Sequence, residues 1–577
     1  MNIFKKVTTP SKVAIVLSAM TVLPIIGGSA IAKSDTSSSK YRSQSAGQSA
    51  AYLGQVSKRA IASGNLSRLK TKIGNRQWNR NSGHSNADLR TRIQFWHTVA
   101  LDTTALDHTT ARDGEDVVSP VQQGGPTRTS RALAMVQIAV FEVVNACGGP
   151  FNSYLGGLNA NNSISVDAAI AKAALKTLVS LYPDQEDRLT EIYEDDLALI
   201  KKSERRWAVE KGISFGERVA NAILDIRSDD GSDFTEPEFG EGGAVADGTT
   251  TWFGTDVNGG STNVGEWETD PNTPNDTLAL GASWGAVTPF FLQSGDQFRV
   301  PEPALPNDDA YTQAYLEVAS LGGSPENTNT PSSGTDETRF IGNFWGYDGV
   351  PLIGVPPRVY NQIAAQIADN EIQEPVQYAR YLALINAGLA DVGIAAWDSK
   401  YYYNYWRPVT GIRKDDGSDA TPVDVDWNPV GVSVINTDEA IRPTPPFPAY
   451  PSGHAAFGAS TFEIMRSFFG DDMSFTFISD EYDGEGVDPF FPDQPRPLVP
   501  VRFESFTQAQ EQNGRSRVYN GVHWNFDDTA GQALGVDVAS YLLNETQAFS
   551  EPSTSKRRDR GRYIGNNNRR NNGRNRR

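Results

Sequence analysis

Hydrophobic residues recur every three or four positions along most of this chain, which is the period of an amphipathic α-helix rather than of a strand. The pattern begins with Leu89, Ile93 and Trp96 and forms one group of helices over 88–228 and a second over 309–548. The predicted helices span 87–101, 130–144, 166–181, 185–201, 205–227, 309–321, 338–345, 359–370, 375–406, 454–469 and 522–543. This pattern predicts an all-α fold of two four-helix-type bundles, with long loops and few strands.

Segments without this periodicity lie before, between and after the two bundles. Residues 33–87 are rich in Ser, Gly and Asn and predict a flexible lead-in, and 229–308 predict a long Gly/Asp-rich loop region. The tail, 549–577, is rich in Asn and Arg with little to bury, so we expect it to be disordered. Acidic clusters at 229–233 and 480–493 are candidates for calcium, but they lack the EF-hand spacing, and solvated loops are the preferred interpretation.

The N-terminus carries the pattern of a signal peptide. Lys5, Lys6 and Lys12 precede an apolar run, Val13–Ile26, and small residues around Ala32 follow as a cleavage site. A membrane anchor is the alternative, although the run is short beside the ~20 residues of a spanning helix. We therefore expect residues 1–32 to be removed, and the mature protein to be extracellular or periplasmic without a membrane span.

The charge distribution limits the kinds of molecule that the protein is expected to bind. The formal net charge is −18, although the last 22 residues hold ten Lys and Arg against Asp559 alone. The body is therefore strongly acidic, which argues against nucleic acid as its main partner. The single cysteine, Cys147, excludes an intrachain disulfide.

Three short motifs concentrate cations, histidines and small residues. Lys400 and Arg407-Pro408 fit K-x6-R-P, residues 451–454 read P-S-G-H, and Ser516 to Asp527 fit S-R-x5-H-x3-D. Arg donates in a fork to oxyanions and Lys acts as a point charge. We expect Lys400 and Arg407 near one face of the helix 375–406, because seven residues are almost two turns. Together the motifs predict a pocket for a tetrahedral oxyanion.

The remaining motif residues have their own expected roles. Ser452 and the Gly453 amide would donate to the oxyanion, and Ser452 also suits a helix N-cap. His454 is a candidate general acid or base. His523 and Asp527 are four residues apart on a predicted helix, so the carboxylate is expected to orient the imidazole. Any one of Lys400, Arg407 and Arg517 alone could be an ordinary surface charge. Three cations at the motif spacing argue against that interpretation.

These motifs resemble, without a substitution, those of the superfamily that unites vanadium-dependent haloperoxidases with type-2 acid phosphatases. The run Pro445–His454 is similar to that of fungal-type vanadium chloroperoxidases, and Trp397, three residues before Lys400, matches the same group. The stretches Ser130–Met135, Phe344–Gly349 and Pro356–Asn361 also resemble them. The likeness spans about residues 88–545, which favours the haloperoxidase branch over the much shorter secreted phosphatases.

The resemblance implies a vanadate cofactor in the C-terminal bundle. His523 would be the axial vanadium ligand, and His454 would exchange protons with peroxide, with Asp348 as its partner. Lys400 would also polarise the bound peroxide. The vanadate oxygens would be held by Lys400, Arg407, Ser452, Gly453 and Arg517. The implied reaction uses hydrogen peroxide to oxidise halide to hypohalous acid, which then attacks organic acceptors.

Phe447 bears on the choice of halide. The residue matches the chloroperoxidases, whereas algal bromoperoxidases carry histidine at this place. Its apolar ring favours oxidation of chloride and bromide, with iodide as a further candidate.

Two other functions are compatible with the same pocket. A secreted phosphatase would use His523 as the nucleophile and His454 as the acid. A protein that only binds oxyanions would need the donors alone, so the two histidines count against it.

Overall fold

The structure is a computed structural model that describes residues 86–109, 121–160, 163–239, 242–248, 250–252, 263–273, 278–437, 442–547 and 549–551. All of them belong to one compact unit, residues 44–577. The predicted signal peptide, 1–32, lies outside the described residues. So do the lead-in, except its last two positions, and most of the basic tail.

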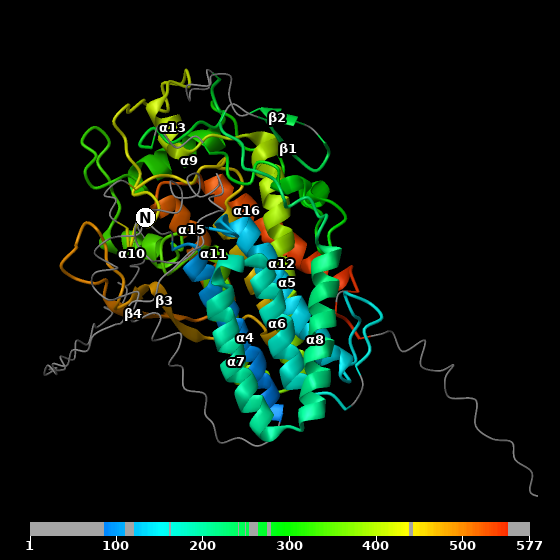
Figure 1. Cartoon of the computed structure of the whole chain (residues 1–577). Coiled ribbons are helices and arrows are strands. Elements are labelled where there is room, and N and C mark those ends of the chain that lie inside the picture. Colours follow the sequence, from blue (N-terminus) through cyan, green and yellow to red (C-terminus); the bar gives the residue numbers. More distant parts are fainter. Residues whose placement is uncertain are drawn as a thin grey trace, which may run out of the picture. The chain divides into compact units, whose positions relative to one another are not determined.

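The described residues form thirteen α-helices and two short hairpins, which confirms the all-α fold (Figure 1). The first helices are α4 (Asn86–Asp107), α5 (Gly125–Ala146), α6 (Val166–Leu181), α7 (Glu186–Ser203) and α8 (Arg206–Ile226). The later ones are α9 (Asp309–Leu321), α10 (Asp336–Phe344), α11 (Pro356–Glu371), α12 (Pro375–Tyr403), α13 (Pro408–Arg413), α14 (Gly453–Phe469), α15 (Phe506–Tyr519) and α16 (Asn525–Asn544). The strands are β1 (Gly242–Ala244), β2 (Thr250–Trp252), β3 (Phe475–Asp483) and β4 (Leu498–Phe503). The 3-10 turns are η1 (Pro183–Gln185), η2 (Trp284–Ala286) and η3 (Gly295–Phe298).

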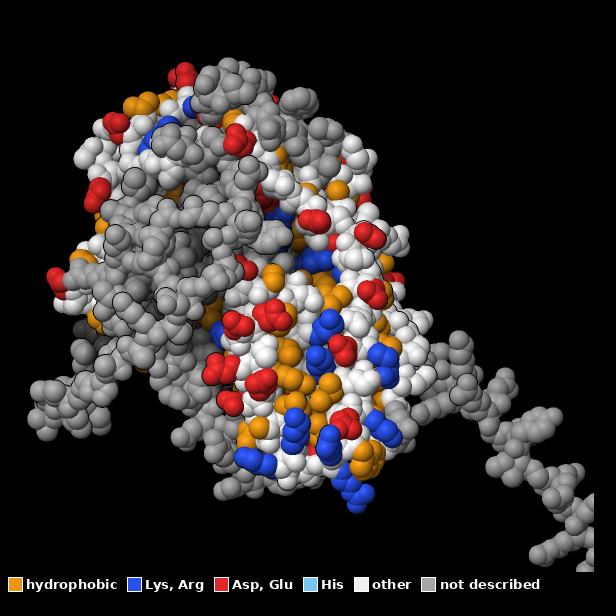
Figure 2. Space-filling view, viewed as in Figure 1, with side chains coloured by type: hydrophobic (Ala, Val, Ile, Leu, Met, Phe, Trp, Pro, Cys, Tyr) orange, Lys and Arg blue, Asp and Glu red, His pale blue; other side chains and the backbone are white. Residues whose placement is uncertain are grey.

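Glycines let α6 and α8 approach closely in the first group of helices. A Cβ at Gly212 or Gly216 would lie 2.2 Å from the carbonyl oxygen of Ser165 or Ala169, respectively. Ser165 also starts α6, since its side chain accepts the Ala168 amide at 3.0 Å. Over the face of these helices that Figure 2 shows, acidic and basic side chains are interspersed among apolar ones.

The long helix α12 is the centre of the fold. It packs against α5, α14 and α16. Among the described residues it is the one helix long and apolar enough to cross a membrane, but 94% of that window is buried inside the protein, as in a core helix. Asn404 caps its end with φ 47°, in the left-handed region that Asn tolerates.

Two expectations about local structure were wrong at the ends of helices. Arg407 does not share a helix with Lys400, because α12 ends at Tyr403 and Arg407 has extended backbone before α13. Pro408 favours this break, since the residue before a proline avoids the helical conformation. His523 also lies outside a helix, because α16 begins at Asn525 with Trp524 as its N-cap.

The sequence pattern missed α15 and the β3–β4 hairpin. The apolar residues of α15 are few, and its buried face carries polar groups such as Asn513, Ser516 and Arg517. The hairpin is antiparallel, with Phe475 opposite Phe503 and a break in register after Ile478. Both elements bury polar side chains, so hydrophobic periodicity could not predict them.

Candidate active site

Backbone contacts between α14 and α16 position the P-S-G-H segment. Ser452 is the N-cap of α14, and its own amide donates to the carbonyl of Asp527 at 2.9 Å. A Cβ at Gly453 would lie 3.2 Å from the Trp397 ring, and a Cβ at Gly531 would lie 2.5 Å from the Ser452 carbonyl. The two glycines thus let α14 approach the aromatic wall on one side and α16 on the other.

Three cations are buried beside this segment. Lys400, Arg407 and Arg517 are each at most 1% exposed. Lys400 Nζ donates to the carbonyls of Pro448 and Ala449, both at 2.8 Å. Burial, and then Arg407, lower the pKa of Lys400 well below its usual range. Since both influences disfavour the ammonium, an anion beside these cations would be strongly stabilising.

Arg407, the arginine of the K-x6-R-P motif, is held by two main-chain carbonyls, those of Phe447 and Val522. Arg407 Nε and Nη2 donate to the Phe447 carbonyl at 3.1 and 2.9 Å, and Nη1 donates to the Val522 carbonyl at 2.8 Å. Arg407 Nη1 is also 3.2 Å from His523 Nε2. The guanidinium therefore links three segments that are far apart in the sequence.

Asp527 fixes the tautomer of His523. The Asp527 Oδ2 oxygen accepts both His523 Nδ1–H at 2.8 Å and the Trp524 amide at 3.1 Å. Burial raises the pKa of Asp527 to about 8. Because the Arg407 guanidinium can only donate, its contact with Nε2 at 3.2 Å makes Nε2 the acceptor and leaves the ring proton on Nδ1. Burial, and then Arg407, lower the pKa of His523 well below its usual range. The neutral imidazole therefore keeps a lone pair on Nε2.

His454 and Arg517 face Asp348. His454 Nε2 is 2.8 Å from the Gly346 carbonyl and 3.9 Å from Asp348 Oδ1. Arg517 Nη2 donates to the same Oδ1 at 2.7 Å. Burial raises the pKa of Asp348, which Arg517 opposes, and burial followed by Arg517 lowers the pKa of His454. The expected pairing of His454 with Asp348 is thus loose, and the close partner of Asp348 is Arg517.

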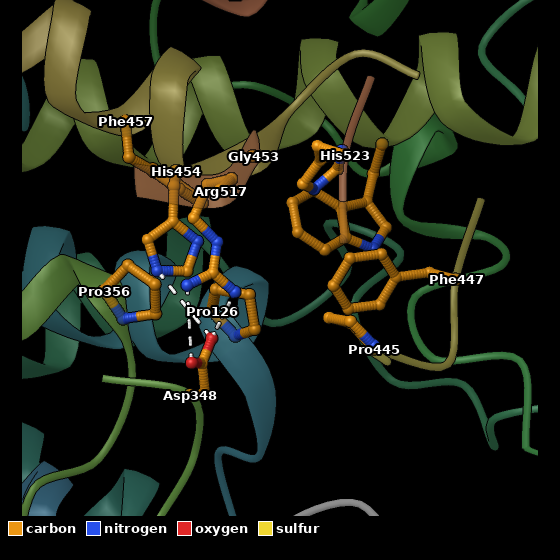
Figure 3. A pocket seen from close by; sticks show the side chains of 11 residues that line it. Pro126, Asp348, Pro356, Pro445, Phe447, Gly453, His454, Phe457, Arg517 and His523 are labelled. Atoms are coloured by element: carbon orange, nitrogen blue, oxygen red, sulfur yellow. Dashed lines mark hydrogen bonds and ion pairs between the residues drawn. The ribbon is translucent and has the colours of Figure 1, made fainter. Parts of the chain in front are cut away.

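A pocket opens between these two groups of residues. In Figure 3, Asp348 is joined by dashed lines to His454 and Arg517, while His523 and Phe447 lie together across the view. The lining consists of Pro126, Asp348, Pro356, Trp397, Pro445, Phe447, Gly453, His454, Phe457, Arg517 and His523. Lys400, Arg407 and Ser452 are not among them. Lys400 Nζ and the Arg407 guanidinium instead lie 5.1 and 5.0 Å from the centre of the Phe447 ring.

No role in the pocket was predicted for Pro126, Pro356, Pro445 or Phe457. Phe457 is three residues after His454 on α14, so helical periodicity could have suggested it. Pro356 and Pro445 belong to stretches that resemble the chloroperoxidases. Pro126 comes from the start of α5, and no local signal places it there.

The donor set fits a tetrahedral oxyanion such as vanadate. Arg517 Nε is buried and has no hydrogen-bond partner among the described residues. The helix dipole at the start of α14 adds to the field of the three cations. His523 Nε2, a neutral imidazole nitrogen, would be available as a ligand for the metal of such an oxyanion.

The calcium hypothesis has no comparable support. Within the described parts of the chain, no group of three or more His, Cys, Asp or Glu side chains could hold a metal ion. The acidic loops are instead used in ion pairs, such as Asp230 with Arg131 and Asp488 with Arg496.

Comparisons with known proteins give a family match and a curated relative. Residues 380–552 match the family model described as the VCPO second helical-bundle domain. The chain is 28% identical over 510 residues to the vanadium chloroperoxidase of Curvularia inaequalis, covering 77% of this chain and 80% of that protein.

Two solved structures share the fold. A bacterial vanadium-dependent iodoperoxidase superposes with a TM-score of 0.62 at 22% identity, over 80% of this chain and 98% of its own. The holo form of a bacterial vanadium-dependent chloroperoxidase gives 0.52 at 17% identity, over 73% and 93%.

The fold and the site define an α-helical protein whose buried cations and two histidines suit an oxyanion. Together with the family match and the curated relative, they support a vanadium haloperoxidase.

Proposed function

We propose that this enzyme binds vanadate and uses hydrogen peroxide to oxidise chloride or bromide to hypohalous acid. Iodide is a further candidate halide, and organic molecules would accept the oxidised halogen. The observation that carries the proposal is the position of His523 Nε2, 3.2 Å from Arg407 Nη1 in a site with three buried cations. An imidazole lone pair directed at the cations suits a vanadium ligand and also the nucleophile of a phosphatase. The matches to vanadium haloperoxidases support the vanadium ligand.

The chain's own residues would act as follows. Vanadate, when bound, supplies a Lewis acid that activates peroxide. His523 would be its protein ligand, and the oxygens would be held by Lys400, Arg407, Arg517, Ser452 Oγ and the Gly453 amide. His454 would move a proton at Nε2, the atom that also contacts the Gly346 carbonyl. The rings of Trp397 and Phe447, 4.9 Å apart, would exclude water from the cations.

A direct test separates oxidation from phosphate chemistry. The protein would be incubated with orthovanadate in phosphate-free buffer, and halogenation of a phenolic dye followed with peroxide and bromide, then chloride. Hydrolysis of p-nitrophenyl phosphate would run in parallel. We expect vanadate-dependent halogenation that excess phosphate suppresses and that His523→Ala abolishes. Ester hydrolysis without halogenation would instead assign the site to a phosphatase with His523 as nucleophile.

We further propose that the enzyme works outside the cytoplasm, in the medium or the periplasm. The charged, apolar and small-residue order of residues 1–32 supports this. N-terminal sequencing of protein recovered from the medium or periplasm should begin near Lys33. An intact Met1 would contradict removal of the segment.

A further inference from the structure

The segment Gly346–Asp348 sets the orientation of two groups in the pocket. Its Gly346 carbonyl lies 2.8 Å from His454 Nε2, and its Asp348 carboxylate accepts from Arg517 Nη2 at 2.7 Å. Tyr347, between them, has φ 46°, in the left-handed region that a bulky side chain rarely adopts. Such a conformation persists only where the surroundings hold it in place. The position of His454 and Arg517 therefore depends on what holds this segment.

One buried carboxylate, Glu481 of β3, holds it. Glu481 is fully buried, and its Oε1 accepts the Tyr347 amide at 3.0 Å. A Cβ at Gly346 would lie 2.7 Å from the same oxygen, so the carboxylate also lies against the neighbouring residue. The unfavourable backbone of Tyr347 is thus fixed by a side chain more than 130 residues later in the chain.

The other oxygen of Glu481 reaches Asp348 through a second residue. Oε2 accepts the Ser433 hydroxyl at 2.8 Å, and the Ser433 amide donates to Asp348 Oδ2 at 2.9 Å. The two oxygens of one carboxylate therefore support the segment from two sides.

Arg496 completes the cluster. Its Nη1 donates to Glu481 Oε2 at 2.7 Å, and its Nη2 donates to Asp488 Oδ2 at 2.9 Å. Burial raises the pKa of Glu481 to about 7, and Arg496 opposes this rise. The arginine thus favours the charged carboxylate, which can accept from all of its donors at once.

We propose that Glu481, paired with Arg496, is a positioning residue of the active site. It acts through the Tyr347 amide and Ser433 to orient His454 and Arg517 toward the oxyanion. The inference rests on the proposed function only in taking this pocket as the one used for turnover. None of the three motifs contains Glu481, Arg496 or Ser433.

The test uses Glu481→Gln in the full-length protein. The Gln side chain has the same shape as Glu, but its NH2 group replaces one of the two oxygens that accept hydrogen bonds from Tyr347, Ser433 and Arg496. Binding of inorganic phosphate to protein free of vanadate would be measured by calorimetry. The titration midpoint of the His454 imidazole would be followed by NMR, with His454→Ala to assign its signal among five histidines. We expect phosphate binding about tenfold weaker, the usual scale for a lost outer contact, and a displaced His454 midpoint.

Glu504→Gln is the matched control, since this carboxylate lies just after β4 and is exposed beside Arg502. It should bind phosphate as the wild type does. If Glu481→Gln fails to fold, Ser433→Ala carries the test, because it removes only the hydroxyl and keeps the amide that donates to Asp348. It should weaken phosphate binding in the same direction by a smaller factor.

Unchanged phosphate affinity together with an unchanged His454 midpoint, in whichever of the two variants folds, would overturn the proposal. Both readouts are independent of halide oxidation. A wild type that fails to halogenate would refute the proposed function, and these measurements would still decide the role of Glu481.

Discussion

His523 donates its Nδ1 proton to Asp527 at 2.8 Å and thereby leaves Nε2 free of hydrogen, 3.2 Å from Arg407 Nη1. The pair spans only four residues, yet it does not depend on a shared helix. Asp527 is the third residue of α16 and reaches back across the helix start, where it also accepts the Trp524 amide. One carboxyl group therefore caps a helix and selects the tautomer of the proposed ligand.

Replacing Asp527 by Asn should weaken the support that the carboxylate gives His523. The Trp524 amide keeps the Asn carbonyl oxygen opposite Nδ1, but a neutral carbonyl accepts less strongly than a carboxylate and so lowers the basicity of Nε2. We expect vanadate affinity to fall by about 10- to 100-fold, as for other groups that orient metal-bound histidines. Calorimetric titration with orthovanadate checks this. Asp528→Asn, on the next residue and hydrogen-bonded to Gln532, is the control and should retain affinity.

Lys400→Met should remove the stabilisation that an anion gives the fold. A ligand that binds only the folded state adds about 2.7 kcal/mol at 100 times its dissociation constant. We expect orthovanadate to raise the melting temperature of the wild type and to raise that of the variant much less. Each increment is measured within one protein. The comparison therefore cancels the stability that the variant loses with the two hydrogen bonds from Lys400 to main-chain carbonyls. An equal increment in both proteins would exclude Lys400 from the anion site.

Phe447→His should lower the oxidation of chloride more than that of bromide. The Phe447 ring covers Lys400 and Arg407 at about 5 Å and keeps water from them. A polar ring would admit water and weaken the field of the cations, and chloride is the harder halide to oxidise. Steady-state rates with each halide at constant peroxide give the ratio. Phe447→Leu, which stays apolar, should keep the ratio closer to that of the wild type.

His108 should make the fold sensitive to acid. Burial lowers its pKa from 6.5 to about 4, while its ring nitrogens bind the Thr104 carbonyl and the Gly125 amide. Since the unfolded chain takes up the proton first, this contribution is complete above pH 6.5 and is lost as the pH falls toward 4.

The comparison of wild type with His108→Gln isolates this group. The stability advantage of the wild type should shrink by on the order of 3 kcal/mol between pH 6.5 and 4. Urea unfolding at several pH values measures it. The subtraction removes the opposite trend of Asp107, whose pKa burial raises to about 7. A pH-independent difference would contradict the assignment.

The sequence by itself determined the helical class and the residue types of the candidate site. Helical periodicity is local, so it predicted most of the helices between 87 and 543. The cations and histidines of the motifs could be predicted because each motif is defined by residue type and spacing alone. The order of these motifs also gave the resemblance that the comparisons support.

Only the tertiary structure decided how those residues meet. Arg407 reaches His523 because α12 stops at Tyr403 and the chain turns, which depends on Asn404, Pro408 and the contacts around them. Pro126 enters the pocket from α5, and Glu481 supports it from β3. These contacts join segments a hundred or more residues apart, and polar groups buried in them have no periodicity to reveal them. Their positions follow from the packing of the whole fold, because a buried carboxylate or guanidinium is stable only where all of its partners converge.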